Sequence, residues 1–167
     1  MFGFFGQGLL ENLVASFVDN VFRDTVYPIK GSIVYCELAF GYAEHSGIYV
    51  GNNRIVHLDG SGDIEIVSPK KFINRLGGFN SAISIYVSCD GESPVGSNKI
   101  AERAIDKVGS CRDYNVILDN CHQFTSGCIS GNFENSESFL WMLKHTAKSE
   151  INANTWRVWH RVDGEYI

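Results

Sequence analysis

The sequence predicts a single α+β domain in which helices pack against a small antiparallel sheet. Strand-like segments come first along the chain and helical segments follow, an order that favours this class over an alternating parallel sheet. At 167 residues the chain has the size of one domain, and no internal repeat or linker divides it. Its composition, 44% hydrophobic and 20% charged, is that of an ordinary globular protein.

Residues 1–27 are predicted to form an amphipathic helical segment. A cleavable signal peptide is not expected, because the segment lacks a basic start and carries Glu11 and Asp19. The helix either packs on the domain or on a second subunit, or it lies in a membrane surface. Packing is favoured, because the Lys/Arg-rich polar face of interfacial helices is missing. The apolar positions that follow helical spacing are Leu9, Leu10, Leu13, Val14, Phe17, Val18, Val21 and Phe22.

Three later stretches have the composition of strands, over residues 32–40, 63–68 and 81–89. Between the first two, residues 45–58 read "HSGIYVGNNRIVHL", which predicts a hairpin. Asn52 and Asn53 form its expected turn, between a strand that ends in a glycine and a returning strand. The hairpin places His45 at the start of one strand and His57 at the end of the next.

Helical patterns account for most of the remaining chain. A short helical turn is expected after residue 69, and longer helices over residues 98–109, 121–131 and 136–149. Ser97 and Gly109 mark the expected ends of the first of these longer helices. Asp119 or Asn120 precedes the second, which Gly131 ends. Glu137 lies in the first turn of the third. The tail, residues 155–162, is either a strand or an ordered arm.

Overall charge and cysteine content argue against several classes of protein. A net charge of −5 argues against nucleic-acid binding, because a phosphate-binding surface needs an excess of Lys and Arg. No apolar run is long enough to cross a bilayer. Five unevenly spaced cysteines do not form a disulfide framework, so free thiols and a cytoplasmic location are expected.

Most of the cysteines have a structural interpretation. Cys36, Cys89 and Cys128 are predicted to be buried thiols, because free cysteine is among the most buried residue types. A zinc site around Cys111 and Cys121 lacks the paired short spacings of structural zinc sites, so no metal is predicted. The three tryptophans are expected in the core and not on a lipid-binding face. They are Trp141, Trp156 and Trp159.

Cys121 is the strongest candidate for a reactive group. It follows the capping residues of a predicted helix, where unpaired N–H groups and the positive dipole end favour a thiolate and stabilise an oxyanion. A thiolate also needs a base beside it and a group that orients the base. The paired strands that carry His45 and His57 supply both, with one imidazole facing the sulfur and the other steadying the first.

The segments "HSGIYVG", "RIVHL" and "NCHQF" together resemble the lecithin:retinol acyltransferase (LRAT) family, within the NlpC-like, circularly permuted papain-like superfamily. His45 and His57 match the family's two histidines, and Cys121 matches its nucleophile. The flanking asparagine and phenylalanine also match. The two residues after the cysteine are His-Gln here instead of the family's Glu-His, so the family's substrate preference does not carry over directly.

The resemblance implies a catalytic domain over residues 28–135, with a helix and tail of residues 136–167 packed on it. It implies that His45 acts as general base and later as acid, that His57 orients it, and that Cys121 forms an acyl thioester. Water or an amine or alcohol would resolve this thioester. The implied substrate is a phospholipid or another acyl-bearing small molecule. Peripheral membrane contact stays open, and no cofactor is needed.

Three further residues are expected beside the catalytic trio. They are Asn120, Tyr49 and His122, the last of which is either exposed or next to the site. Two other functions stay open: a cysteine amidase or peptidase of the same superfamily, and an interaction domain without turnover. The intact trio argues against the interaction domain. The oligomeric state is not predicted.

Overall fold

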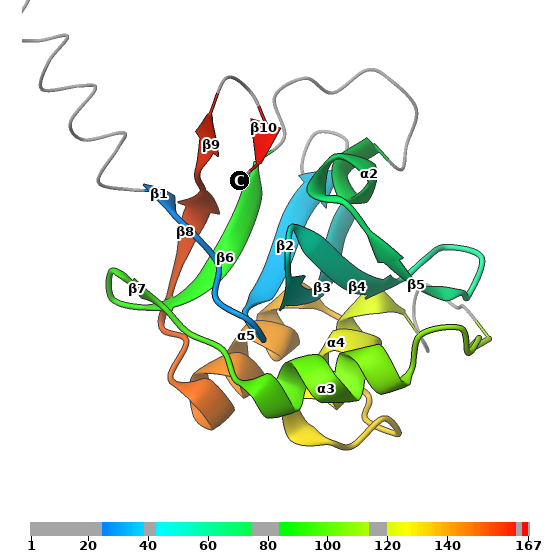
Figure 1. Cartoon of the computed structure of the whole chain (residues 1–167). Coiled ribbons are helices and arrows are strands. Elements are labelled where there is room, and N and C mark those ends of the chain that lie inside the picture. Colours follow the sequence, from blue (N-terminus) through cyan, green and yellow to red (C-terminus); the bar gives the residue numbers. More distant parts are fainter. Residues whose placement is uncertain (1–24, 39–42, 75–83, 114–119, 163–164, 167) are drawn as a thin grey trace, which may run out of the picture.

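The computed structural model describes residues 25–38, 43–74, 84–113, 120–162 and 165–166 (Figure 1). Residues 1–24 of the segment predicted to be helical lie outside these ranges, and Thr25 and Val26 near its end form a strand instead of a helix. In the described part of the chain, the strands are β1 (Thr25–Val26), β2 (Ile33–Leu38), β3 (Ala43–Gly51), β4 (Arg54–Leu58), β5 (Ile64–Val67), β6 (Ile85–Asp90), β7 (Ser93–Pro94), β8 (Thr155–Trp159), β9 (Arg161–Val162) and β10 (Glu165–Tyr166). The helices are α2 (Pro69–Ile73), α3 (Asn98–Asp106), α4 (Cys121–Ser130) and α5 (Leu140–Ile151). The predicted α+β class is confirmed.

The main sheet is larger than the sequence predicts, and it is mixed. Its strand order is β1-β8-β6-β2-β3-β4-β5, with β7 paired to β6, and β9 and β10 form a separate pair. Most neighbours are antiparallel as expected, but β1 runs parallel to β8, with Thr25 opposite Val158. The tail accounts for the difference, because it enters the sheet as β8 between β1 and β6.

The predicted hairpin is confirmed as strands β3 and β4. Asn52 and Asn53 have φ values of 51° and 53°, the left-handed pair that a type I′ turn requires and that asparagine tolerates. The turn pairs Gly51 with Arg54, and a β-bulge between Tyr49 and Gly51 then shifts the register by one residue, so that Ile48 lies opposite Val56. Register decides which face of the sheet each side chain occupies, so the turn and the bulge together place the two histidines.

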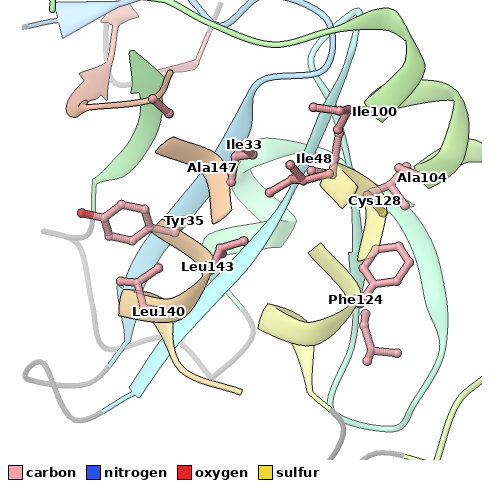
Figure 2. Close-up of a cluster of buried hydrophobic side chains, with 14 of the residues drawn as sticks. Ile33, Tyr35, Ile48, Ile100, Ala104, Phe124, Cys128, Leu140, Leu143 and Ala147 are labelled. Carbon is pink, nitrogen blue, oxygen red and sulfur yellow. The ribbon is translucent and has the colours of Figure 1, made fainter. Parts of the chain in front are cut away.

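Both faces of the central strands are buried. Helices α3, α4 and α5 lie together on one side of the sheet (Figure 1). Ile33 and Tyr35 of β2 belong to the cluster on this side, whereas Val34 and Cys36 belong to the opposite cluster, which α2 completes with Phe72. Figure 2 shows the helix-side cluster. Burial on both faces explains why β2 is apolar without alternation from Ile33 to Cys36, whereas the exposed Glu37 follows near its end.

Two helix ends differ from the prediction. Ser97 caps α3 as expected, with its hydroxyl accepting from Ile100 N at 3.3 Å, but α3 ends at Asp106, before Gly109. Helix α5 begins at Leu140, so Glu137 precedes it. The Glu137 carboxylate instead accepts hydrogen bonds from the hydroxyls of Ser126 in α4 and Thr146 in α5. Glu137 therefore links two helices and is not part of a first turn.

The cysteines follow the prediction, but one tryptophan does not. Cys36, Cys89 and Cys128 are buried, and burial raises the pKa of both the Cys89 and Cys128 thiols. Trp159 is fully buried, yet Trp141 is 68% exposed, so its predicted place in the core is wrong. The buried positions of α5 are Leu140, Leu143 and Ala147, and the residue after Leu140 lies about 100° further round the helix. Trp141 therefore points away from the core.

Candidate active site

The hairpin brings His45 and His57 into direct contact. His45 Nε2 and His57 Nδ1 share a hydrogen bond of 2.7 Å, and the two residues are 3% and 1% exposed. The β3–β4 register, continued from Ile48 opposite Val56, puts His57 across from Gly47 and diagonal to His45 on the same face. A Cβ atom at Gly47 would lie 2.7 Å from the Val56 carbonyl oxygen and 3.2 Å from His57 Cβ, so only glycine fits there.

An aromatic side chain supports both imidazoles. The Phe72 ring of α2 lies 4.7 Å from the His45 ring and 5.6 Å from the His57 ring, measured between centroids. Helix α2 is held at this place by Ser68, whose hydroxyl accepts from Lys71 N at 3.2 Å, and by Pro69 in its first turn. The fully buried Phe72 therefore limits how far either ring can tilt.

Two charged residues beside His57 were not predicted from the sequence. Glu65 lies opposite His57 in the β4–β5 ladder, and its Oε1 is 3.3 Å from His57 Nε2. Its other oxygen accepts a hydrogen bond of 2.7 Å from Lys71 Nζ. This hydrogen bond is the main cause that lowers the pKa of Glu65. The one signal in the sequence is a glutamate in the middle of an otherwise apolar strand.

Cys121 is the first residue of α4, as predicted. Asn120 is its N-cap: the side-chain oxygen accepts from His122 N at 2.9 Å and from Gln123 N at 3.3 Å. Gln123 completes a capping box by accepting from Asn120 N at 3.0 Å. The helix closes at Gly131, with φ of 84°. The capping chemistry read from the sequence is therefore confirmed, with Asn120 as the cap.

The thiol lies against the strand that carries His45. Cys121 is 3% exposed, and its Sγ is 3.9 Å from the carbonyl oxygen of Glu44. That oxygen belongs to the peptide group that joins Glu44 to His45. The structure thus sets the start of α4 next to the start of β3, and it places the Cys121 side chain beside the backbone that leads into His45.

His122 occupies a separate polar cluster on the helix side of β3. Its Nδ1 shares a hydrogen bond of 2.9 Å with Ser46 Oγ, which also lies 3.2 Å from the Cys121 carbonyl oxygen and 3.1 Å from Thr125 Oγ1. Of the two environments expected for His122, exposed or next to the site, the exposed one is wrong, because the residue is buried. Burial lowers its pKa to about 4, and the ring is neutral at pH 7. The nearest carboxylate oxygen of Glu44 is 4.0 Å from its Nε2.

The remaining predicted neighbours lie at different ends of the site. The Asn120 side chain donates to the Ser138 carbonyl at 2.8 Å, which ties the start of α4 to the segment before α5. Tyr49 packs against Trp159, with ring centroids 5.1 Å apart. It is four residues along β3 from His45, or about 13 Å of extended chain. Tyr49 therefore belongs to the packing of the tail.

The described ranges contain neither a helix suited to crossing a membrane nor a cluster of metal ligands. No helix there is long and apolar enough to span a bilayer. In the same ranges, no three His, Cys, Asp or Glu side chains stand close enough together to hold a metal ion.

Two kinds of known protein are similar in sequence to this chain. Human phospholipase A and acyltransferase 2 is 32% identical over 101 residues, which are 52% of this chain and 62% of the human protein. Two genome polyproteins of avian encephalomyelitis virus, strains L2Z and Van Reokel, are each 29% identical over 112 residues, which are 66% of this chain and 5% of the polyprotein. The chain thus spans less than two thirds of either kind of relative. No solved structure gives a significant match. The family model for lecithin retinol acyltransferase matches residues 28–134, and the chain therefore belongs to the LRAT family.

Proposed function

We propose that this protein is a thiol-dependent acyltransferase or hydrolase, in which Cys121 carries the acyl group as a thioester. The observation that carries the proposal is the buried hydrogen bond between His45 and His57, next to a cysteine at a helix N-terminus. Membership of the LRAT family supports the reaction class. A permuted papain-like arrangement, with both histidines before the cysteine in the chain, is part of the same proposal.

In this proposal each imidazole has a different role. Because His45 Nε2 is bonded to His57, Nδ1 is the nitrogen with which His45 accepts the thiol proton of Cys121. The thiolate attacks the acyl carbonyl, and the positive end of the α4 dipole stabilises the negative charge that develops on the carbonyl oxygen. His45 then returns the proton to the leaving group. Attack by water completes hydrolysis, and attack by an amine or alcohol completes transfer.

Phospholipids are the proposed acyl donors. The human relative is named as a phospholipase and acyltransferase, which supports this substrate class. In addition, Phe139 and Trp141 are 56% and 68% exposed and follow Ser138, which accepts a hydrogen bond from the Asn120 cap of the Cys121 helix. Aromatic side chains of this kind favour the bilayer interface. Peripheral contact with a lipid surface, in a reducing compartment such as the cytoplasm, completes the proposal.

The competing functions are an amidase or peptidase with the same trio and an interaction domain without turnover. Incubating the protein with mixed phospholipids and with peptide amides, followed by mass spectrometry of the products, separates the three. We expect free fatty acid or acylated acceptor from the lipids, and none from the Cys121→Ser variant. Cleaved amides would support the amidase, and unchanged substrates in both mixtures would support the interaction domain.

The exposed aromatic residues allow a second test of the substrate class. Trp141→Ser should raise the KM for phospholipid in vesicles by several-fold, while turnover of a short-chain water-soluble ester stays unchanged. The exposed Ile105 of α3, replaced by serine, provides a control away from Ser138. Equal effects of Trp141→Ser on both substrates would contradict a role in lipid contact.

A further inference from the structure

A line of polar side chains continues from the histidine pair to the protein surface. His57 Nδ1 bonds to His45, His57 Nε2 lies 3.3 Å from Glu65 Oε1, and Glu65 Oε2 accepts from Lys71 Nζ at 2.7 Å. The last two side chains are 34% and 63% exposed. An exposed ion pair of this kind contributes little to stability. Its place behind His57 therefore calls for another explanation.

The tautomers of the two imidazoles depend on the hydrogen bond that the Glu65 carboxylate accepts from His57. An ionised carboxylate has only acceptors, so it favours the form of His57 that carries its proton on Nε2. Neutral His57 with its proton on Nε2 has an unprotonated Nδ1, which acts as a hydrogen-bond acceptor. In the hydrogen bond between the two histidines, the proton therefore belongs to His45 Nε2. Neutral His45 is thereby left with an unprotonated Nδ1, the nitrogen that the base needs to accept a proton from Cys121.

The opposite tautomer would disable the base. If His57 carried its proton on Nδ1, it would donate to His45 Nε2, and neutral His45 would hold its own proton on Nδ1. That nitrogen would then have no lone pair for the thiol. A carboxylate behind a catalytic imidazole selects a tautomer in this way in other triads. We propose that Glu65 is a positioning residue that sets the tautomer of both histidines, and that Lys71 holds its carboxylate in place.

The charged groups around Glu65 are consistent with this role. The Glu65 carboxylate faces His57 of β4 and Lys71 of α2. The hydrogen bond from Lys71 keeps this carboxylate ionised at neutral pH. The neighbouring Lys70 lies 3.9 Å from Glu165 instead. The 3.3 Å contact is just beyond the usual hydrogen-bond range, so small movements of an exposed side chain decide how well it holds His57. The ammonium of Lys71 limits those movements.

The inference rests on the proposed function, and three variants test it. Glu65→Leu removes the acceptor, Glu65→Gln keeps an acceptor oxygen without the charge, and Lys71→Met removes the anchor. We expect kcat to fall by roughly tenfold in Glu65→Leu, with partial recovery in Glu65→Gln and a smaller loss in Lys71→Met. Glu92→Gln is the matched control, because Glu92 forms a 3.3 Å ion pair with Arg157 of β8, which lies near the opposite edge of the sheet from β5.

A second measurement reports the tautomer without any turnover. ¹⁵N NMR of the imidazoles should show His57 protonated at Nε2 in the wild type and in Glu92→Gln, and a rising share of the Nδ1-protonated form in Glu65→Leu. Unchanged imidazole signals in Glu65→Leu, at wild-type kcat, would overturn the inference. If the wild type turns over no acyl substrate, the proposed function fails, and the imidazole signals alone then decide the role of Glu65.

Discussion

Strand β3 separates two histidine clusters that contain similar residues but differ in charge. On one face, His45 bonds to His57, and the path continues through Glu65 to Lys71. On the other face, His122 bonds to the Ser46 hydroxyl, and its closest carboxylate oxygen is 4.0 Å away. His45 and His122 are similarly buried, at 3% and 6% exposure. Burial therefore does not distinguish their roles.

The difference lies in what stabilises a positive charge. In the proposed reaction His45 accepts a proton, the adjacent imidazole accepts a hydrogen bond from it, and a carboxylate stands behind that imidazole. His122 has a neutral hydroxyl as its bonded partner, and its lowered pKa shows that burial disfavours the cation. The first cluster is suited to moving a proton. The second fixes the first turn of α4 on β3, through the contacts of Ser46 with Cys121 and Thr125.

The largest expected effect is on turnover when each histidine is replaced in turn. His45→Gln should lower kcat/KM by about 100- to 10,000-fold, because it removes the proposed acid–base, with little change in Tm. His122→Gln should lower turnover per folded protein by less than about tenfold, but reduce stability by about 1–3 kcal/mol, because the buried hydrogen bond between His122 and Ser46 is lost. Steady-state kinetics and thermal melts measure both. Equal losses of kcat/KM in His45→Gln and His122→Gln would contradict the different roles given to the two clusters.

An intermediate effect is expected for His57. A glutamine oxygen at this position still accepts from His45 Nε2, so His57→Gln should retain more activity than His45→Gln. The two variants are compared under identical conditions with one confirmed ester substrate. A larger loss in His57→Gln than in His45→Gln would reverse the assignment of base and orienting residue.

A smaller effect concerns thiol reactivity. Cys121 should react with iodoacetamide at pH 6.5 at least about tenfold faster than Cys36, Cys89 or Cys128, because a helix N-terminus favours the thiolate. Cys111 is exposed, so the comparison is made in a Cys111→Ser background, with peptide mapping by mass spectrometry. First labelling of Cys36 or Cys89 would contradict the choice of nucleophile.

The smallest effect is on the acid limb of stability. The pKa of His122 is about 4 in the folded protein and 6.5 in its ordinary state, so the unfolded chain binds the extra proton between these values. Stability should therefore fall as pH drops from about 6.5 to about 4, with His122 contributing at most about 3 kcal/mol. His122→Gln should flatten the Tm profile in this window, as calorimetry measures. An unchanged slope would show that His122 is charged in the folded state.

Local chemistry explains which parts of the fold the sequence predicts. Asn52 and Asn53 predict the β-turn, and Asn120 and Gly131 predict the ends of α4. Each of these residues acts on neighbours only a few positions away in the sequence. The turn, together with the β-bulge beside it, positions His45 and His57, and the cap positions Cys121. Whether the three act together in catalysis remains a proposal that the tests above address.

Contacts between distant segments explain what the sequence does not predict. The pairing of β1 with β8 joins the two ends of the described chain, and no local pattern encodes it. Glu65 and Lys71 acquire their roles only because β5 and α2 fold back on β4, and Ser46 acquires its role when α4 docks. The exposure of Trp141 also depends on distant contacts. Its place in the helix does not show which helix face the rest of the domain buries.

The central claim is that Cys121 carries the acyl group, and acid-quenched mass spectrometry tests it most directly. The wild-type protein, mixed with phospholipid vesicles and stopped within seconds, should gain the mass of one acyl chain, which peptide mapping assigns to Cys121 and neutral hydroxylamine removes. Cys111→Ala, the control, should gain the same mass, and Cys121→Ala should gain none. Turnover of the lipid by Cys121→Ala, or an acyl group on any other residue, would contradict the account.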